Sequence, residues 1–356
     1  MVSLRQPFHR QRHHGGSRPS SLRRAGSIRL AIGALALATF VIPAQGQPSG
    51  PAINVSGAVV QIDGRPAFLT GVSVFDALGT AAPRDADLDA LKSWGVNTVR
   101  VWAHWHEPIH QSDGSLTPSG QARLLALVGR LQSRGLILEL VLLRPGQLPG
   151  QPFPVFASEA ARTRAVEAMT LALRPFRNVL FDLYNEHDHP DGPITHAAAR
   201  ALRDKVKAID GARVVTISST EFHLVSPNGE IDDAHARNVR EEATKDAGSV
   251  AVDLVAPHFP RTDDWAAATA TRVRAVRAVL DRNGSRVPIY LSEERRADGS
   301  ARIQPSAYQL ALANARSAGA AGWVFHTAAG FELKKTPFLD ALAAEERAAL
   351  PLLRRP

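Results

Sequence analysis

From residue 53 onward, short apolar runs rich in β-branched residues alternate with longer stretches in which apolar residues recur at helical spacing. The clearest helical stretch carries Leu124, Leu127, Val128 and Leu131 on one face. The short runs predict strands that are buried on both faces, as in a parallel sheet. Eight strand–helix units follow one another, and their strands are expected at 67–75, 96–105, 136–143, the start of 179–188, 214–220, 251–259, 287–293 and 320–327.

This alternation predicts an α/β fold, a single (β/α)8 TIM barrel. A doubly wound open sheet is the competing fold, but it usually carries a Gly-rich phosphate loop after the first strand, and residues 70–79 contain no GxGxxG. Residues 54–69 add a short N-terminal β-hairpin, turned at Asp63–Gly64, before the barrel. The last helix is expected from about 339 to 350.

The positive charge of the chain is concentrated at its N-terminus. The 356 residues carry a formal charge of +8, but residues 1–46 hold seven arginines and no Asp, Glu or Lys. The remaining residues have 35 basic and 34 acidic side chains, so the charge gives little support for a nucleic-acid partner.

The same N-terminal segment has the pattern of a secretory signal peptide. Its arginines precede the apolar run 30–42, and small residues follow up to Gly46. We therefore expect a signal peptide at 1–46 and one catalytic domain at 47–356, exported to the periplasm or beyond and free of the membrane once the signal is removed. An uncleaved anchor is the alternative. The chain has no cysteine and so no disulfide, and the sequence leaves its oligomeric state open.

Polar side chains gather where the predicted strands end, which is the catalytic face of a barrel. The fourth strand ends in Asn185 and Glu186, and the seventh ends in Glu293 and Glu294. Strands four and seven lie almost opposite in an eight-stranded ring, so two carboxylates can face each other across its mouth. Other polar residues at strand ends are Ser73, Asp76, Arg100, His104, His106, Ser218, Ser219, Thr220, Glu221, His258 and His326.

Two facing carboxyl groups suit the cleavage of a glycosidic bond with retention. One carboxyl acts as general acid and then base, and the other, about 5–5.5 Å away, attacks the anomeric carbon. Burial beside a second carboxylate is expected to raise the pKa of the acid. Arg100 is the candidate that keeps the nucleophile ionised, and Asn185 is the candidate that holds the sugar 2-hydroxyl. This chemistry needs no cofactor or metal.

The motifs resemble those of the clan A retaining glycoside hydrolases, in particular the family 5 cellulases and mannanases, over roughly residues 53–350. The segments that carry the resemblance are GRPAFLTGVSVFDA (64–77), LDALKSWGVNTVRVW (88–102), SDGSLTPSGQARLLALVGRLQSRGLIL (112–138), VLFDLYNE (179–186), PHF (257–259), VPIYLSEE (287–294) and GWVFH (322–326).

The resemblance implies a β-linked oligo- or polysaccharide as substrate, Glu186 as acid/base and Glu293 as nucleophile. The distance in sequence from Pro288 favours Glu293 over Glu294 as the nucleophile. We expect Glu294 to pair with Arg295 or Arg296 instead. The implied substrate-binding residues are Arg100, Asn185, His258 and Trp323, the last as a platform under the sugar in the cleavage subsite.

Four positions depart from the family pattern. His187 replaces a proline after the acid, Ser73 replaces an asparagine, and Arg144 stands where the family has a histidine. Pro260 replaces the tyrosine that normally hydrogen-bonds the nucleophile. These changes leave open a non-catalytic glycan-binding barrel.

A metal-dependent barrel hydrolase is the third hypothesis. The stretch 186–189 and the pair His104 and His106 offer His and carboxylate side chains. The pair does not form the HxH that opens the first strand of metal-dependent barrel hydrolases, so a catalytic metal is not expected.

Overall fold

The computed structural model describes residues 50–79, 82–105, 109–145, 156–220, 231–297, 302–329, 331 and 336–354. They belong to one compact unit, Pro48–Pro356. The predicted signal peptide at 1–46 and the candidates His106 and Glu221 lie outside the described residues.

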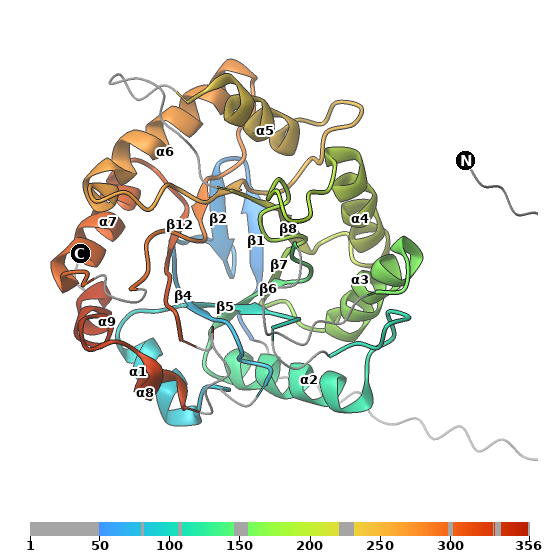
Figure 1. Cartoon of the computed structure of the whole chain (residues 1–356), viewed down its shortest axis with the longest axis horizontal. Helices are drawn as coiled ribbons and strands as arrows, with labels where there is room; N and C mark the ends of the chain where they lie inside the picture. The colour runs from blue at the N-terminus through green and yellow to red at the C-terminus, as the bar shows by residue number, and fades with distance from the viewer. Residues whose placement is uncertain are drawn as a thin grey trace, which may run out of the picture. The chain divides into compact units, whose positions relative to one another are not determined.

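The parallel strands form a closed ring with the helices outside it (Figure 1). Seven strands make one sheet in the order β11-β12-β4-β5-β6-β7-β8. β9 pairs with β10, and a parallel bridge between Val255 and Ile289 joins the β10 segment to β11, which completes the ring. The predicted (β/α)8 barrel is confirmed. Its strands are β4 (Leu69–Val74), β5 (Thr98–Trp102), β6 (Ile137–Val141), β7 (Val179–Asp182), β8 (Val214–Thr216), β9 (Ser218–Ser219), β10 (Ala256–Pro257), β11 (Tyr290–Leu291) and β12 (Gly322–Phe325).

A helix follows each strand position of the barrel. Several begin at a side chain that accepts a hydrogen bond from the first turn, as Thr117, Ser158 and Thr195 do. The helices are α1 (Asp85–Ser93), α2 (Pro118–Ser133), α3 (Glu159–Leu173), α4 (His196–Ile209), α5 (Asp233–Ala243), α6 (Trp265–Arg282), α7 (Pro305–Ser317), α8 (Phe338–Ala341) and α9 (Ala344–Ala349).

The predicted last helix, 339–350, is broken in the structure. α8 ends at Ala341, the backbone of Leu342 and Ala343 is extended, and α9 then begins. The break buries the Leu342 side chain, and Glu346 accepts a hydrogen bond from the Ala343 N–H at 3.1 Å. After α9 the chain tightens into a 3-10 turn, Leu350–Arg354.

The predicted N-terminal hairpin is present, with one turn more than expected. β1 (Ile53–Ser56), β2 (Val59–Ile62) and β3 (Arg65–Pro66) form an antiparallel sheet. Asp63 and Gly64 both have positive φ, at 53° and 72°, as a two-residue type I′ turn requires.

This small sheet lies behind the ring in Figure 1 and closes its amino-terminal end. Ile53 and Val60 pack in one apolar cluster with Leu69, Ile137 and Leu180 at the starts of barrel strands. The polar mouth is therefore left at the other end. Among the described residues, no helix is long and apolar enough to cross a membrane.

Candidate active site

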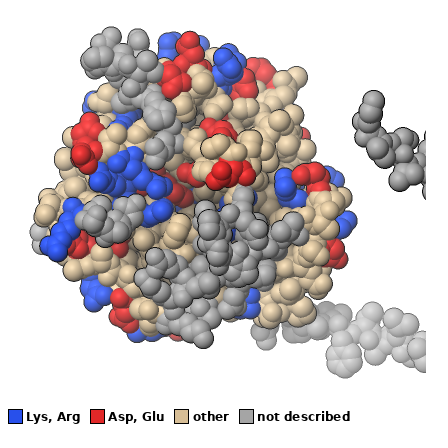
Figure 2. Space-filling model, in the orientation of Figure 1, with Lys and Arg blue, Asp and Glu red and all other residues tan. Residues whose placement is uncertain are grey.

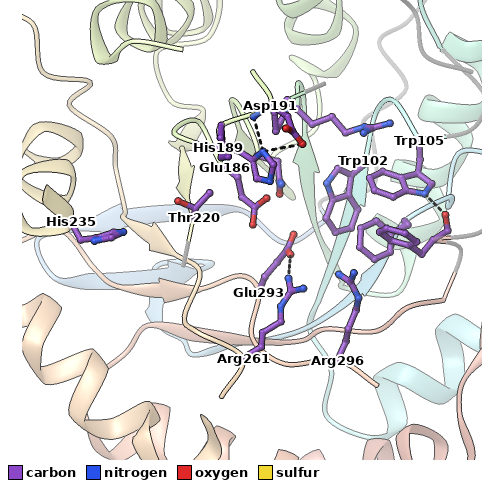
Figure 3. A pocket seen from close by; sticks show the side chains of 16 residues that line it. Trp102, Trp105, Glu186, His189, Asp191, Thr220, His235, Arg261, Glu293 and Arg296 are labelled. Atoms are coloured by element: carbon purple, nitrogen blue, oxygen red, sulfur yellow. Dashed lines mark hydrogen bonds and ion pairs between the residues drawn. The ribbon is translucent and has the colours of Figure 1, made fainter. Parts of the chain in front are cut away.

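A pocket of about 470 Å³ lies at the carboxyl ends of the strands (Figure 3). Glu186 and Glu293 point toward one another across it. Near the centre of the face in Figure 2, basic side chains lie next to acidic ones. The side chains that line the pocket include the aromatic Phe75, Trp102, Trp105 and Phe331, the cationic Arg144, Arg261 and Arg296, and Asn185.

The two carboxylates are close enough to act on one anomeric carbon. Each offers an oxygen, and these oxygens lie within 4.8 Å of each other and of a His258 ring nitrogen. Inverting enzymes keep their carboxyl groups roughly 6.5–9.5 Å apart to admit a water, whereas retaining enzymes hold them at about 5–5.5 Å. The spacing fits retention.

Cationic and imidazole groups surround Glu293, whose side chain is 5% exposed. Arg100 and Arg261 each place a guanidinium nitrogen 3.3 Å from one of its oxygens. Burial raises the pKa of Glu293, but His326, His258 and Arg100 lower it more strongly, to about 2. Glu293 is therefore ionised at neutral pH, as a nucleophile must be.

His326 lies between Glu293 and Arg296. Its Nε2 lies 3.3 Å from Glu293 Oε2 but accepts a hydrogen bond from Arg296 at 2.8 Å, so this nitrogen carries no hydrogen. Burial lowers the pKa of His326 well below its usual value.

Glu186 is held by a single histidine. His258 Nδ1 donates to Glu186 Oε1 at 3.0 Å, and its Nε2 accepts from the Ser292 hydroxyl at 3.1 Å. Burial raises the pKa of Glu186, but the hydrogen bond from His258 gives a net lowering. The expectation that burial leaves Glu186 with a raised pKa is wrong, because the sequence did not place His258 against its carboxylate.

The backbone at Glu186 is unusual. Its φ is +51°, in the left-handed region that residues with a side chain rarely adopt. The Glu186 N–H donates to Ser218 Oγ at 3.1 Å, and the His187 N–H donates to the Ser218 carbonyl at 2.9 Å. Asp182 accepts the Ser218 hydroxyl at 2.7 Å, so the neighbouring strand fixes this turn.

Arg100 and His258 lie beneath the pocket and do not line it. Arg100 is fully buried, and it forms ion pairs with Glu139 and Asp182 as well as Glu293. Both residues were predicted to bind substrate, and Arg100 was also predicted to lie beside the second carboxylate, which its 3.3 Å contact with Glu293 bears out. The structure places them against the carboxylates of Glu293 and Glu186, with His258 only 1% exposed.

Asn185 does reach the pocket, as predicted. Its Oδ1 accepts from Arg100 Nη2 at 2.6 Å, which leaves the amide nitrogen as the group available to a sugar hydroxyl.

The expectation for Trp323 is wrong. Its ring is 1% exposed and does not line the pocket, and its indole N–H donates to Glu294. Trp323 is the second residue of β12, so it lies inside the barrel and not at the rim. The indoles on the pocket wall are those of Trp102 and Trp105.

Glu294 turns away from the pocket. It accepts hydrogen bonds from Trp323 and, at 2.9 Å, from Thr269, so the expected pairing with Arg295 or Arg296 is wrong. Burial raises the pKa of Glu294 to about 7. This environment favours the neutral acid and supports the choice of Glu293.

Arg261 is a site residue that the sequence interpretation missed. It lies three residues after His258, and in Figure 3 it reaches Glu293 from the same side as Arg296. Its guanidinium contacts Glu293, the residue that the tyrosine expected at position 260 would hydrogen-bond in the family pattern. An arginine just past the strand end was the available signal.

In the part of the chain that the structure describes, two groups of side chains have the composition of a metal site. One is Glu186, His258 and Glu293, in the pocket, and the other is His187, His196 and Glu242. In the first group, hydrogen bonds and arginines already satisfy both carboxylates. The His104 and His110 rings lie with their centroids 4.6 Å apart and their planes tilted by 40°.

Comparison with known proteins agrees with this geometry. The model of the family described as cellulase (glycosyl hydrolase family 5) matches residues 60–328. Among curated proteins, none matches this chain.

Several solved structures share the fold. An endo-1,4-β-mannanase from Eisenia fetida aligns with a TM-score of 0.59 and 13% identity, over 86% of this chain and 96% of that one. A β-1,4-D-mannanase from Cryptopygus antarcticus gives 0.57 and 16%, over 85% and 94%. A β-glucanase from Saccharophagus degradans gives 0.57 and 14%, over 86% and 93%. At these identities the likeness concerns the fold alone.

Proposed function

Because the chain belongs to the cellulase family, glycosyl hydrolase family 5, we propose that it cleaves β-linked glycans with retention, using Glu186 as acid/base and Glu293 as nucleophile. The observation that carries this proposal is the approach of the two carboxylates, whose oxygens lie within 4.8 Å. Asn185, on the pocket wall beside the acid, is the residue proposed to hold the substrate.

The contacts of the two carboxylates support the proposed roles. Two guanidinium groups lie 3.3 Å from Glu293, whereas Glu186 receives one hydrogen bond from an imidazole. As the pH falls, the first proton therefore binds Glu186. The carboxyl that gains a proton more easily is the acid, and the one that resists protonation is the nucleophile.

In the first step, Glu293 attacks the anomeric carbon while Glu186 gives its proton to the departing glycosidic oxygen. This leaves a glycosyl ester on Glu293 and an ionised Glu186. In the second step, Glu186 takes a proton from a water, which attacks the same carbon and releases Glu293. Each carboxyl returns to its starting state, and no cofactor enters the balance.

The wall of the pocket supports a sugar substrate. Phe75 stacks on Trp102 with centroids 4.1 Å apart, and Trp105 donates its indole N–H to the Phe331 carbonyl at 2.9 Å. Rings held in this way can stack on apolar sugar faces. Arg144, Arg261 and Arg296 add positive charge, so acidic glycans belong in the substrate panel beside neutral mannans and glucans.

Export is a separate part of the proposal. The arginine-rich, then apolar, pattern of residues 1–46 supports a cleaved signal and a mature enzyme in the periplasm or outside the cell. Sequencing the N-terminus of protein recovered from those fractions tests this, and a start near residue 47 is expected.

Hydrolysis of aryl β-glycosides and polysaccharides by wild type and by Glu186→Ala and Glu293→Ala tests the function. Both variants should lose turnover, and azide should rescue Glu186→Ala with a β-glycosyl azide as product. Glu294→Gln is the matched control, because the neighbouring glutamate lies outside the pocket. Proton NMR of the first product should show retention.

A wild-type protein that binds glycans without cleaving any of the panel would favour the second candidate, a non-catalytic binding barrel. The loss of the family's tyrosine at Pro260 is the feature that motivates this candidate. The contact of Arg261 with the nucleophile argues against it.

A further inference from the structure

A second cluster of ionisable side chains lies outside the pocket, next to the turn that carries Glu186. It consists of His187, His196 at the start of α4, and Glu242 near the end of α5. One ligand atom from each lies within 4.8 Å of the others. His187 is 1% exposed and Glu242 is fully buried, and none of the three lines the pocket.

The His196 ring is oriented by an outer carboxylate. Its Nδ1 lies 2.9 Å from Glu241 Oε2, so this nitrogen carries the hydrogen and Nε2 keeps its lone pair. Among the described residues, the buried Nε2 finds no hydrogen-bond partner. Histidines that bind metals are commonly oriented in this way, by a carboxylate on the other ring nitrogen.

His187 and Glu242 supply the other donors. His187 Nε2 lies 3.0 Å from Glu242 Oε1, and the His187 and His196 rings meet edge to face with centroids 4.8 Å apart. An ion pair between His187 and Glu242 would pair His187 Nε2 with Glu242 Oε1. It would also place a cationic ring against His196 and leave His196 Nε2 buried without a partner.

A cation accounts for all three groups at once. Two imidazole nitrogens and one carboxylate oxygen are a donor set that zinc and similar divalent transition metals accept in proteins. We propose that His187, His196 and Glu242 bind one such ion, with water completing the coordination. The ion would join the turn after β7 to α4 and α5.

The site has a consequence for the pocket although it does not line it. His187 follows Glu186 directly, and the left-handed backbone at Glu186 sets where the acid points. A metal bound to His187 would hold that turn from behind. Removing the ion should therefore lower the melting temperature and weaken the positioning of Glu186.

The test uses the mature protein, freed of any histidine tag and stripped of metal with a chelator. Calorimetric titration with Zn²⁺ alone should show one equivalent bound and a raised melting temperature. Co²⁺ should bind at the same stoichiometry and give visible absorption bands typical of a site with nitrogen and oxygen ligands. Failure of both ions to bind would overturn the proposal, whatever the fate of the proposed glycosidase activity.

Matched variants locate the ion. His196→Gln should abolish the binding of one equivalent of Zn²⁺. It is also the variant least expected to disturb folding, because the His196 side chain is 17% exposed. Glu242→Gln should do the same. His235→Gln, on the same helix as Glu242, should still bind one equivalent of Zn²⁺.

Binding that survives in His196→Gln overturns the assignment. If the ion is instead lost in Glu293→Gln and kept in His196→Gln, it belongs to the carboxylates of the pocket.

Discussion

The two ends of the barrel differ in what their buried positions contain. At the closed end, the interior is an apolar cluster sealed by the small antiparallel sheet, with Ile53, Leu69 and Ile137 among its members. At the open end, Arg100 and Glu293 are also buried but charged. The first arrangement stabilises the fold by burial alone. The second needs partners for every charge and can do chemistry, so stability and activity should respond to different mutations.

The largest effect should follow a change at the open end. Glu293→Gln removes the attacking oxygen, so we expect kcat/KM to fall by about 10⁴-fold or more. Circular dichroism should show a folded protein. Steady-state kinetics on an aryl β-glycoside measure the effect, and near-normal turnover would remove Glu293 from the mechanism.

The converse effect belongs to the closed end. Ile137→Ala leaves a cavity in the apolar cluster and should lower the free energy of unfolding by about 3 kcal/mol. Its kcat well below the melting temperature should stay within about twofold of wild type, because the mechanism contains no group from that end. Urea denaturation measures the stability, and Leu171→Ala is the control because that side chain is 58% exposed. An Ile137→Ala enzyme that is stable but inactive would contradict the division between the ends.

A smaller effect should come from Arg261→Gln. Glu293 must be ionised, and its pKa is lowered to about 2 by its surroundings. Removing a guanidinium 3.3 Å away raises that pKa, so activity should be lost at a higher pH on acidification. The acidic limb of the pH profile of kcat/KM should move up by about one pH unit.

Arg295→Gln is the matched control for that shift, since Arg295 pairs with the exposed Asp263. An unchanged limb in Arg261→Gln would show that Arg261 does not act on the nucleophile.

The smallest effect on activity should come from Glu294→Gln. The folded-state pKa of Glu294 is raised to about 7 from 4.5, so its contribution to stability is present below pH 4.5 and lost as the pH rises through 7. A glutamine keeps the side chain neutral at every pH. The variant should match wild type in melting temperature at pH 4.5 and exceed it at pH 8, and the opposite order at pH 8 would contradict the assignment.

The sequence predicted the barrel and the positions of the two glutamates well. The alternation of apolar runs and helical stretches is a local signal, and it predicted the eight strands of the barrel. Asn185 and Glu186 stand out because polar residues end a buried run. The break at Leu342 was missed, because only its burial against the barrel favours an extended backbone there.

Depth within the barrel could not be predicted. Strands buried on both faces lack the alternation of polar and apolar residues that would show where each side chain points. Trp323 was therefore placed at the rim although it lies inside, and His258 was given to the substrate although it contacts Glu186. The expected contact of Arg100 with Glu293 is present, but Arg100 is too deep to line the pocket. Arg261 contacts Glu293 from the segment between β10 and α6. In such a segment, no regular spacing in the sequence predicts where a side chain points.

The left-handed backbone at Glu186 has a consequence for protein engineering. Such a conformation costs a residue with a side chain about 1 kcal/mol, and a glycine there would release that strain. A directed-evolution campaign that screens for heat tolerance alone would therefore favour replacing this glutamate. Under the proposed mechanism, the selected variants would be more stable but inactive unless turnover is screened in the same round.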